Sequence, residues 1–119
     1  MRLLLIHADY LEFEAKQPTP AAEEIPEQLK SGRVDEASPG VVAANAAREI
    51  AGVCEQIETK RVVLYPYAHL SSSLASPATA VEVMNLTREK LEELGFEVQR
   101  LPFGWYKAFT LSCKGHPLS

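Results

Sequence analysis

Two segments of the chain concentrate the side chains that could carry out chemistry. The first, residues 65–74, follows a β-branched run and places His69 beside three serines. Open α/β sheets bind ligands where a strand gives way to a helix, so this segment could hold a polar ligand. Serines and a histidine are explained equally well there as turn and cap residues bonded to the backbone. The residues alone leave both interpretations open.

The second segment, residues 101–109, places aromatic side chains around Pro102 and Gly104 and includes one lysine, Lys107. Glycine would let the backbone approach a ligand closely, and Tyr106 and Lys107 could then reach that ligand. Aromatic rings stack on nucleobases, and an ammonium can meet a carbonyl, a phosphate or a positioned water. The same composition is typical of a packed hairpin, which stands as the alternative interpretation.

Other familiar chemistries lack their sequence patterns. The chain has no glycine-rich phosphate loop and no Gly-x-Ser-x-Gly elbow. Cys113 and His116 form half of a zinc ligand set at most, so we expect neither a metal nor another cofactor. They could form a nucleophilic pair, but we expect a buried strand thiol beside a loop histidine.

Length and composition indicate one globular domain. The chain has 119 residues, of which 46% are hydrophobic and 24% charged. No apolar run approaches the roughly 18–20 residues that a membrane span needs. Two cysteines make no disulfide framework, so we expect reduced thiols and a cytoplasmic location. The net charge of −4 argues against a wide nucleic-acid-binding surface, although residues 98–119 carry three basic residues and no acid.

The apolar patterns predict alternating strands and helices. Ser38-Pro39 and Ser76-Pro77 each combine an N-cap with proline at the first helical position, and Gly95 fits a C-terminal cap. Apolar stripes follow at helical spacing, the second through Val81, Met84, Leu91 and Leu94. We expect strands at 2–7, 10–15, 61–66, 96–101 and 105–113, helices at 38–59 and 76–94, and a loop at 16–33 with one helical turn near 26–30. This order predicts a two-layer α/β or α+β domain whose mixed sheet carries both helices.

Three motifs taken together are specific, although each alone is weak. They are Tyr-Pro-Tyr-Ala-His-Leu-Ser-Ser at 65–72, Pro-Phe-Gly-Trp-Tyr-Lys-Ala-Phe at 102–109 and Ser-Cys-Lys-Gly-His-Pro-Leu at 112–118. With them, and with residues 4–10 and 12–14, the chain resembles the N-terminal editing domain of archaeal threonyl-tRNA synthetase. The resemblance implies a fold similar to D-aminoacyl-tRNA deacylase, a homodimer, and hydrolysis of L-serine wrongly attached to the 3′ end of tRNA(Thr).

The resemblance also implies roles for individual residues. In that family the 2′-OH of the terminal adenosine helps to activate a water, and backbone groups shield the developing oxyanion. By this likeness Lys107 lies near the seryl group and the water, and His69 and Tyr106 are the other candidate catalytic residues. The residues expected to hold the adenosine and seryl moieties are Pro66, Tyr67, Ala68, Phe103, Gly104 and Trp105.

The chain departs from the family pattern in two places. An apolar strand expected between residues 33 and 38 is missing, as is a glutamate that follows the Gly-His-Pro-Leu motif. We therefore expect residues 1–119 to be a single editing domain cut from a longer chain, with the remainder of the synthetase acting in cis or in trans. The alternative functions are a D-aminoacyl-tRNA deacylase and a non-catalytic appendage that binds tRNA or dimerises.

Overall fold

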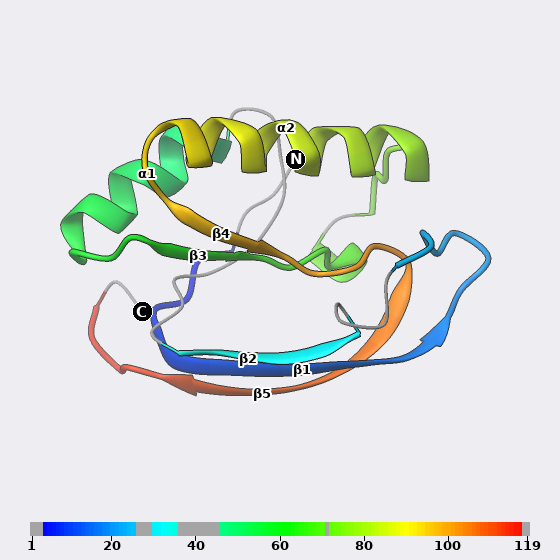
Figure 1. The fold of residues 1–119 in the computed structure, drawn as a ribbon, viewed down its shortest axis with the longest axis horizontal. Coiled ribbons are helices and arrows are strands. Elements are labelled where there is room, and N and C mark those ends of the chain that lie inside the picture. The colour runs from blue at the N-terminus through cyan, green and yellow to red at the C-terminus, as the bar shows by residue number, and fades with distance from the viewer. Residues whose placement is uncertain (1–3, 26–29, 36–45, 71, 118–119) are drawn as a thin grey trace.

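The computed structural model describes residues 4–25, 30–35, 46–70 and 72–117. Three layers are visible in Figure 1: helices α1 and α2, then strands β3 and β4, then strands β1, β2 and β5. The elements in chain order are β1 (Ala8–Pro18), β2 (Ser31–Asp35), α1 (Ala46–Gln56), β3 (Arg61–Leu64), the 3-10 turn η2 (Ala68–Leu70), α2 (Pro77–Glu93), β4 (Glu97–Arg100) and β5 (Trp105–Cys113). The predicted α+β class with two helices packed on strands is confirmed. Within the described ranges no helix is long and apolar enough to cross a membrane.

The strands form two hydrogen-bonded sheets rather than the single mixed sheet expected. One sheet is antiparallel in the order β2-β1-β5, and the other is the parallel pair β3-β4. The parallel pair arises because α2 carries the chain back over the sheet between β3 and β4. The chain then passes directly from β4 to β5, and Leu101 N donates to Leu64 O at 2.9 Å at the point where the two sheets diverge.

Strand β3 is buried on both faces, which explains its short β-branched sequence. Val62 and Leu64 face the helices and pack with residues of both helices, whereas Val63 faces the antiparallel sheet. Val63 there joins Leu11, Phe13 and Leu101. The helix-side core consists of Ala47, Ile50, Cys54, Val62, Leu64, Met84, Leu91 and Phe96. Val63 and Leu101 therefore supply buried contacts between the antiparallel sheet and the rest of the domain.

Helix α2 begins and ends as its sequence predicts. The Ser76 side chain accepts a hydrogen bond from Thr79 N, and Gly95 adopts a φ of +89° just after the helix. The predicted apolar stripe needs one correction, because Leu94 is 56% exposed. Buried Thr87 lies on the inner face instead, and its hydroxyl donates to Val83 O at 2.8 Å.

The N-terminal half contains the larger differences from expectation. Residues 4–7 are not a strand, and the first strand runs from Ala8 to Pro18, beyond the expected 10–15. Part of the expected loop at 16–33 is strand: β1 continues to Pro18, and β2 pairs with β1 from Tyr10↔Asp35 to Glu14↔Ser31. The sequence Ser-Gly-Arg-Val-Asp has no alternating apolar pattern, so this pairing left no signal in the sequence.

Two other predictions fall partly outside the described residues. Residues 26–29 of the helical turn expected near 26–30, and the helix start at Ser38-Pro39, lie there. The described part of α1 ends at Gln56, three residues before the expected end at 59, and Glu58 adopts a φ of +55°. Thr59 N then donates to Cys54 O at 3.0 Å, which closes the helix.

Candidate active site

The turn at 101–105, between β4 and β5, is packed against the segment that follows β1. The carbonyl of Gly104 accepts hydrogen bonds from the backbone N–H and the hydroxyl of Thr19, at 2.9 and 2.6 Å. A β-carbon on residue 104 would lie 2.5 Å from Ala21 O and Ala22 Cα. The close backbone approach that the sequence predicts at Gly104 is thus made on this side by the chain's own segment, which occupies the space.

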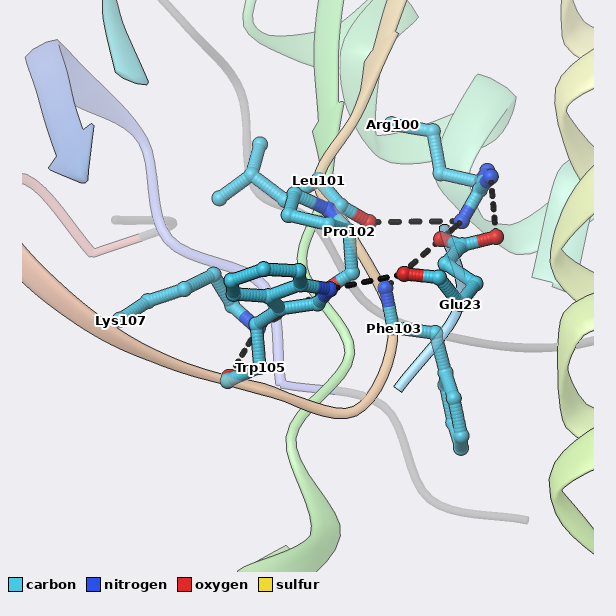
Figure 2. A network of polar contacts seen from close by, with 7 residues as sticks. All are labelled: Glu23, Arg100, Leu101, Pro102, Phe103, Trp105 and Lys107. Carbon is cyan, nitrogen blue, oxygen red and sulfur yellow. Dashed lines mark hydrogen bonds and ion pairs between the residues drawn. The ribbon is translucent and has the colours of Figure 1, made fainter. Parts of the chain in front are cut away.

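Glu23 connects this segment to the turn through its carboxylate. Arg100 binds it with both terminal nitrogens, Nη1 to Oε1 at 2.5 Å and Nη2 to Oε2 at 3.0 Å, and Phe103 N donates to Oε1 at 2.8 Å (Figure 2). Burial would by itself raise the pKa of Glu23, but the hydrogen bonds from Arg100 and Phe103 and the charge of Arg100 outweigh it, so the pKa is lowered. The carboxylate is therefore charged at neutral pH.

Lys107 reaches back from β5 to the same turn. Its ammonium donates to the carbonyl oxygens of Pro102 and Trp105, each at 2.9 Å (Figure 2). The ammonium also lies 5.1 Å from the centre of the Tyr65 ring. Burial lowers the pKa of Lys107 to about 8, although the nearby carboxylate of Glu23 acts in the opposite direction. Lys107 is therefore a partly desolvated amine that changes charge close to physiological pH.

Aromatic rings extend from Lys107 toward solvent along the segment after β3. Tyr65 packs edge-on against Phe109 at 5.5 Å and against Tyr67 at 6.1 Å between ring centres, and Tyr67 packs against His69 at 5.3 Å. Tyr67 and Phe109 are 44% and 50% exposed. We refer to these four residues as the aromatic row. The row leads from a half-buried lysine to an open surface, which suits a ligand with both a small polar group and a flat ring.

The structure brings together most of the predicted site residues but not all of them. Lys107 contacts carbonyls of the turn that contains Phe103 and Gly104, and the segment with Pro66, Tyr67, Ala68 and His69 follows Tyr65. Tyr106 is 65% exposed and, as its neighbour in a strand, points to the face of β5 opposite Lys107. The indole of Trp105 points toward segment 19–23, where Nε1 donates to Glu23 O at 2.9 Å. Tyr106 is therefore not beside the ammonium of Lys107, and the Trp105 indole is bound to segment 19–23.

Sequence reasoning missed Glu23, Arg100, Tyr65 and Phe109 as members of this site. Tyr65 and Phe109 lie at the ends of segments already singled out, so their place in the motifs was the available signal. Glu23 lies in a stretch interpreted as a loop, and Arg100 was counted only as part of a basic segment. Only the backbone pairing of β1 with β5, which aligns Ala15 with Lys107, brings that stretch to the turn.

The third motif lies at the opposite end of β1 and β5. Ala8 pairs with Cys113 there, and His7 Nδ1 is 2.6 Å from His116 Nε2. Cys113 is exposed, which corrects the expectation of a buried thiol, and neither it nor Cys54 forms a disulfide. Across the described ranges, no group of three or more His, Cys, Asp or Glu could hold a metal ion. This end of the molecule is structurally separate from Lys107.

The fold and the site define a small α+β domain with a desolvated lysine beside a row of aromatic rings. A sequence profile described as the archaea-specific editing domain of threonyl-tRNA synthetase matches residues 1–119. The chain belongs to this family, which confirms the resemblance drawn from the three motifs.

Individual relatives agree with this membership. The chain is 53% identical over 132 residues to the threonine–tRNA ligase of Methanothrix thermoacetophila, and 51% identical over 131 residues to that of Methanocaldococcus jannaschii. It is 48% identical over 133 residues to the ligase of Thermococcus gammatolerans. Each match covers 100% of this chain but only 21% of the relative. These alignments are longer than the 119-residue chain, so they include positions to which this chain contributes no residue.

Proposed function

We propose that the chain is an editing hydrolase that cleaves the ester between L-serine and the 3′ end of tRNA(Thr). The observation that carries the proposal is the geometry of Lys107. An ammonium has three N–H donors, and two of them go to the carbonyls of Pro102 and Trp105. The third can then position the attacking water or meet the oxygen on which negative charge develops.

The charge of Lys107 decides what this third position offers. Below a pH of about 8 it is an N–H donor, and above that pH it becomes a lone pair, because the pKa is lowered to about 8. Stabilising a developing oxyanion needs the donor. We therefore assign the ammonium form to the reaction, with the 2′-OH of the terminal adenosine helping to activate the water. This division of labour needs no catalytic triad from the protein.

The aromatic row is the proposed place for the terminal adenosine. Stacking of a base on an aromatic side chain contributes about 1–3 kcal/mol and tolerates any base. Tyr67 and His69 offer exposed rings for it, and we assign the backbone of Pro66, Ala68 and Phe103 to the binding of the adenosine and seryl moieties. Tyr106, on the opposite face of β5, is left to contact the tRNA or a second subunit.

Selectivity for serine follows from size. Serine is threonine without one methyl group, and one such group in an apolar pocket is worth only about 1–3 kcal/mol in binding. A site that charges tRNA with threonine therefore accepts serine at a measurable rate. A second site that excludes the extra methyl group removes the error without destroying the correct product.

The proposed partners are tRNA(Thr) carrying serine and, in a homodimer, a second copy of the chain. The remainder of a synthetase would act in cis or in trans. The net charge of −4 predicts weak binding of the acceptor arm by the domain alone, with the basic residues after Val98 supplying the local attraction.

The test is a comparison of four substrates with the 119-residue chain: L-Ser-tRNA(Thr), L-Thr-tRNA(Thr), and tRNA carrying D-Ser or D-Thr. We expect rapid loss of L-serine while L-threonine stays attached. Faster hydrolysis of the D-esters would instead assign the chain to D-aminoacyl-tRNA deacylation. No hydrolysis of any ester, from a chain shown to be folded, would replace the enzyme by a tRNA-binding or dimerising module.

A further inference from the structure

We propose that Glu23 is a positioning residue for Lys107. It holds the turn at 101–105 in an arrangement that presents two carbonyls to the lysine, and its negative charge acts on that lysine from across the turn. The inference rests on the proposed function, because it deepens the role given there to Lys107. It assigns a function to a residue outside the three family motifs.

Glu23 contacts the turn through its backbone as well as its side chain. Its N–H donates to Phe103 O at 3.2 Å, and its carbonyl accepts the indole N–H of Trp105 at 2.9 Å. Together with the bonds from Arg100 and Phe103 N to the carboxylate, these contacts fix three of the residues from 100 to 105 to one side chain and its own peptide groups (Figure 2). A residue whose role was only to close a loop would not need hydrogen bonds from both its side chain and its backbone.

The turn fixed in this way is the part of the molecule that Lys107 uses. The carbonyl acceptors belong to Pro102 and Trp105, which directly flank Phe103 and Gly104. The Phe103 N–H bonded to Glu23 belongs to the same peptide group as the Pro102 carbonyl. A displacement of the Glu23 carboxylate therefore moves the peptide group between Pro102 and Phe103, and with it the carbonyl oxygen that accepts a hydrogen bond from Lys107.

The carboxylate also acts through its charge. Glu23 favours the ammonium form of Lys107 and so opposes burial, which favours the neutral amine. The salt bridge with Arg100 is largely buried, with side chains 15% and 19% exposed, so solvent screens this interaction less than it would a surface pair. Glu23 and Arg100 should consequently shift the titration of Lys107 in opposite directions.

The experiment measures that titration directly, by NMR of chains carrying 13C-labelled lysine, with the resonance assigned by its loss in Lys107→Met. Glu23→Gln keeps the side-chain size and one acceptor oxygen but removes the charge. We expect the midpoint of Lys107 to fall by about half a pH unit or more. We also expect deacylation of L-Ser-tRNA(Thr) to slow about tenfold, mainly in kcat. Glu23→Asp keeps the negative charge on a side chain that is one methylene group shorter. It should restore the titration midpoint of Lys107 more fully than it restores the rate of deacylation.

Glu24→Gln is the matched control, because Glu24 is the next residue, is exposed and loses the same charge. It should leave both the Lys107 midpoint and the rate unchanged. A folded Glu23→Gln chain with an unshifted Lys107 titration and an unchanged rate overturns the proposal. Should Glu23→Gln not fold, Arg100→Gln provides the second test. This variant removes the positive charge that is paired with the Glu23 carboxylate, so the titration midpoint of Lys107 must rise. A midpoint that does not rise also overturns the proposal.

The titration does not depend on any tRNA substrate, so the two proposals can fail separately. A shifted midpoint in a chain that hydrolyses no ester supports the coupling of Glu23 to Lys107 and removes the proposed function. Hydrolysis of L-Ser-tRNA(Thr) that is indifferent to Glu23, with no shift in the titration, supports the proposed function and removes the positioning role.

Discussion

Gly104 and Ala21 approach so closely that residue 104 has no room for a side chain. A β-carbon there would lie 2.5 Å from the carbonyl oxygen of Ala21, and Gly104 also adopts a φ of +76°. The contact joins the segment after β1 to the turn that supplies carbonyl acceptors to Lys107. Stability and the geometry of the candidate site therefore depend on the same glycine.

Gly104→Ala should lower the free energy of unfolding by about 2–4 kcal/mol, because it adds a backbone clash to the strain of a left-handed alanine. Gly115→Ala is the matched control, since Gly115 has a φ of +74° but open space around its β-carbon position. It should cost only about 1 kcal/mol. Urea unfolding of the two variants measures the difference, and equal losses would show that the packing against Ala21 does not matter.

Replacing Lys107 should change how stability depends on pH. The pKa of Lys107 is about 8 in the folded chain and near 10.5 in an exposed lysine. Between these values the unfolded chain binds more protons, so the stability of the wild type should rise with pH from about 8 toward 10. The Lys107→Met chain lacks this contribution, and the difference between the two chains should grow in favour of the wild type across that window. Urea unfolding at pH 7, 8, 9 and 10 checks it, and a constant difference would contradict the lowered pKa.

The aromatic row makes a separate prediction about binding. Tyr67→Ala should raise the concentration of L-Ser-tRNA(Thr) needed for half-maximal rate about tenfold, because it removes a stacking surface worth about 1–3 kcal/mol. The rate at saturation should change less. Leu86→Ala is the control, because Leu86 is similarly exposed, at 43%, on α2. Steady-state kinetics separate the two effects, and a loss confined to the saturated rate would place Tyr67 in the chemistry instead.

The sequence predicted the elements whose signals are local. The cap at Ser76, the positive φ at Gly95 and the β-branched strand before Tyr65 all depend on a few neighbouring residues, and each is present. Strand β2 was missed because its residues lack an apolar alternation, and pairing with β1 alone defines it. Leu94 was misplaced because α2 ends at Glu93, so Leu94 is the C-cap residue beyond the last helical position and its side chain is 56% exposed.

The candidate site likewise contains residues that could be predicted from the sequence and residues that could not. Lys107 and the segment around His69 could be singled out because their residue types cluster in sequence. The turn's dependence on Glu23 could not, since the ion pair with Arg100 joins residues that only the sheet register brings together. Alternation along β5 does place Tyr106 opposite Lys107, which limits what the motif alone can say about the two side chains.

The most direct test of the account is the pH–rate profile for hydrolysis of L-Ser-tRNA(Thr) by the wild type and by Lys107→Met, corrected for uncatalysed hydrolysis. Lys90→Met, an exposed lysine on α2, is the control and should match the wild type. We predict a wild-type rate that falls as pH rises through about 8, the pKa of Lys107, and a rate about a hundredfold lower and without that fall in Lys107→Met. A Lys107→Met chain that hydrolyses seryl-tRNA at the wild-type rate across the range would contradict the central role of this lysine.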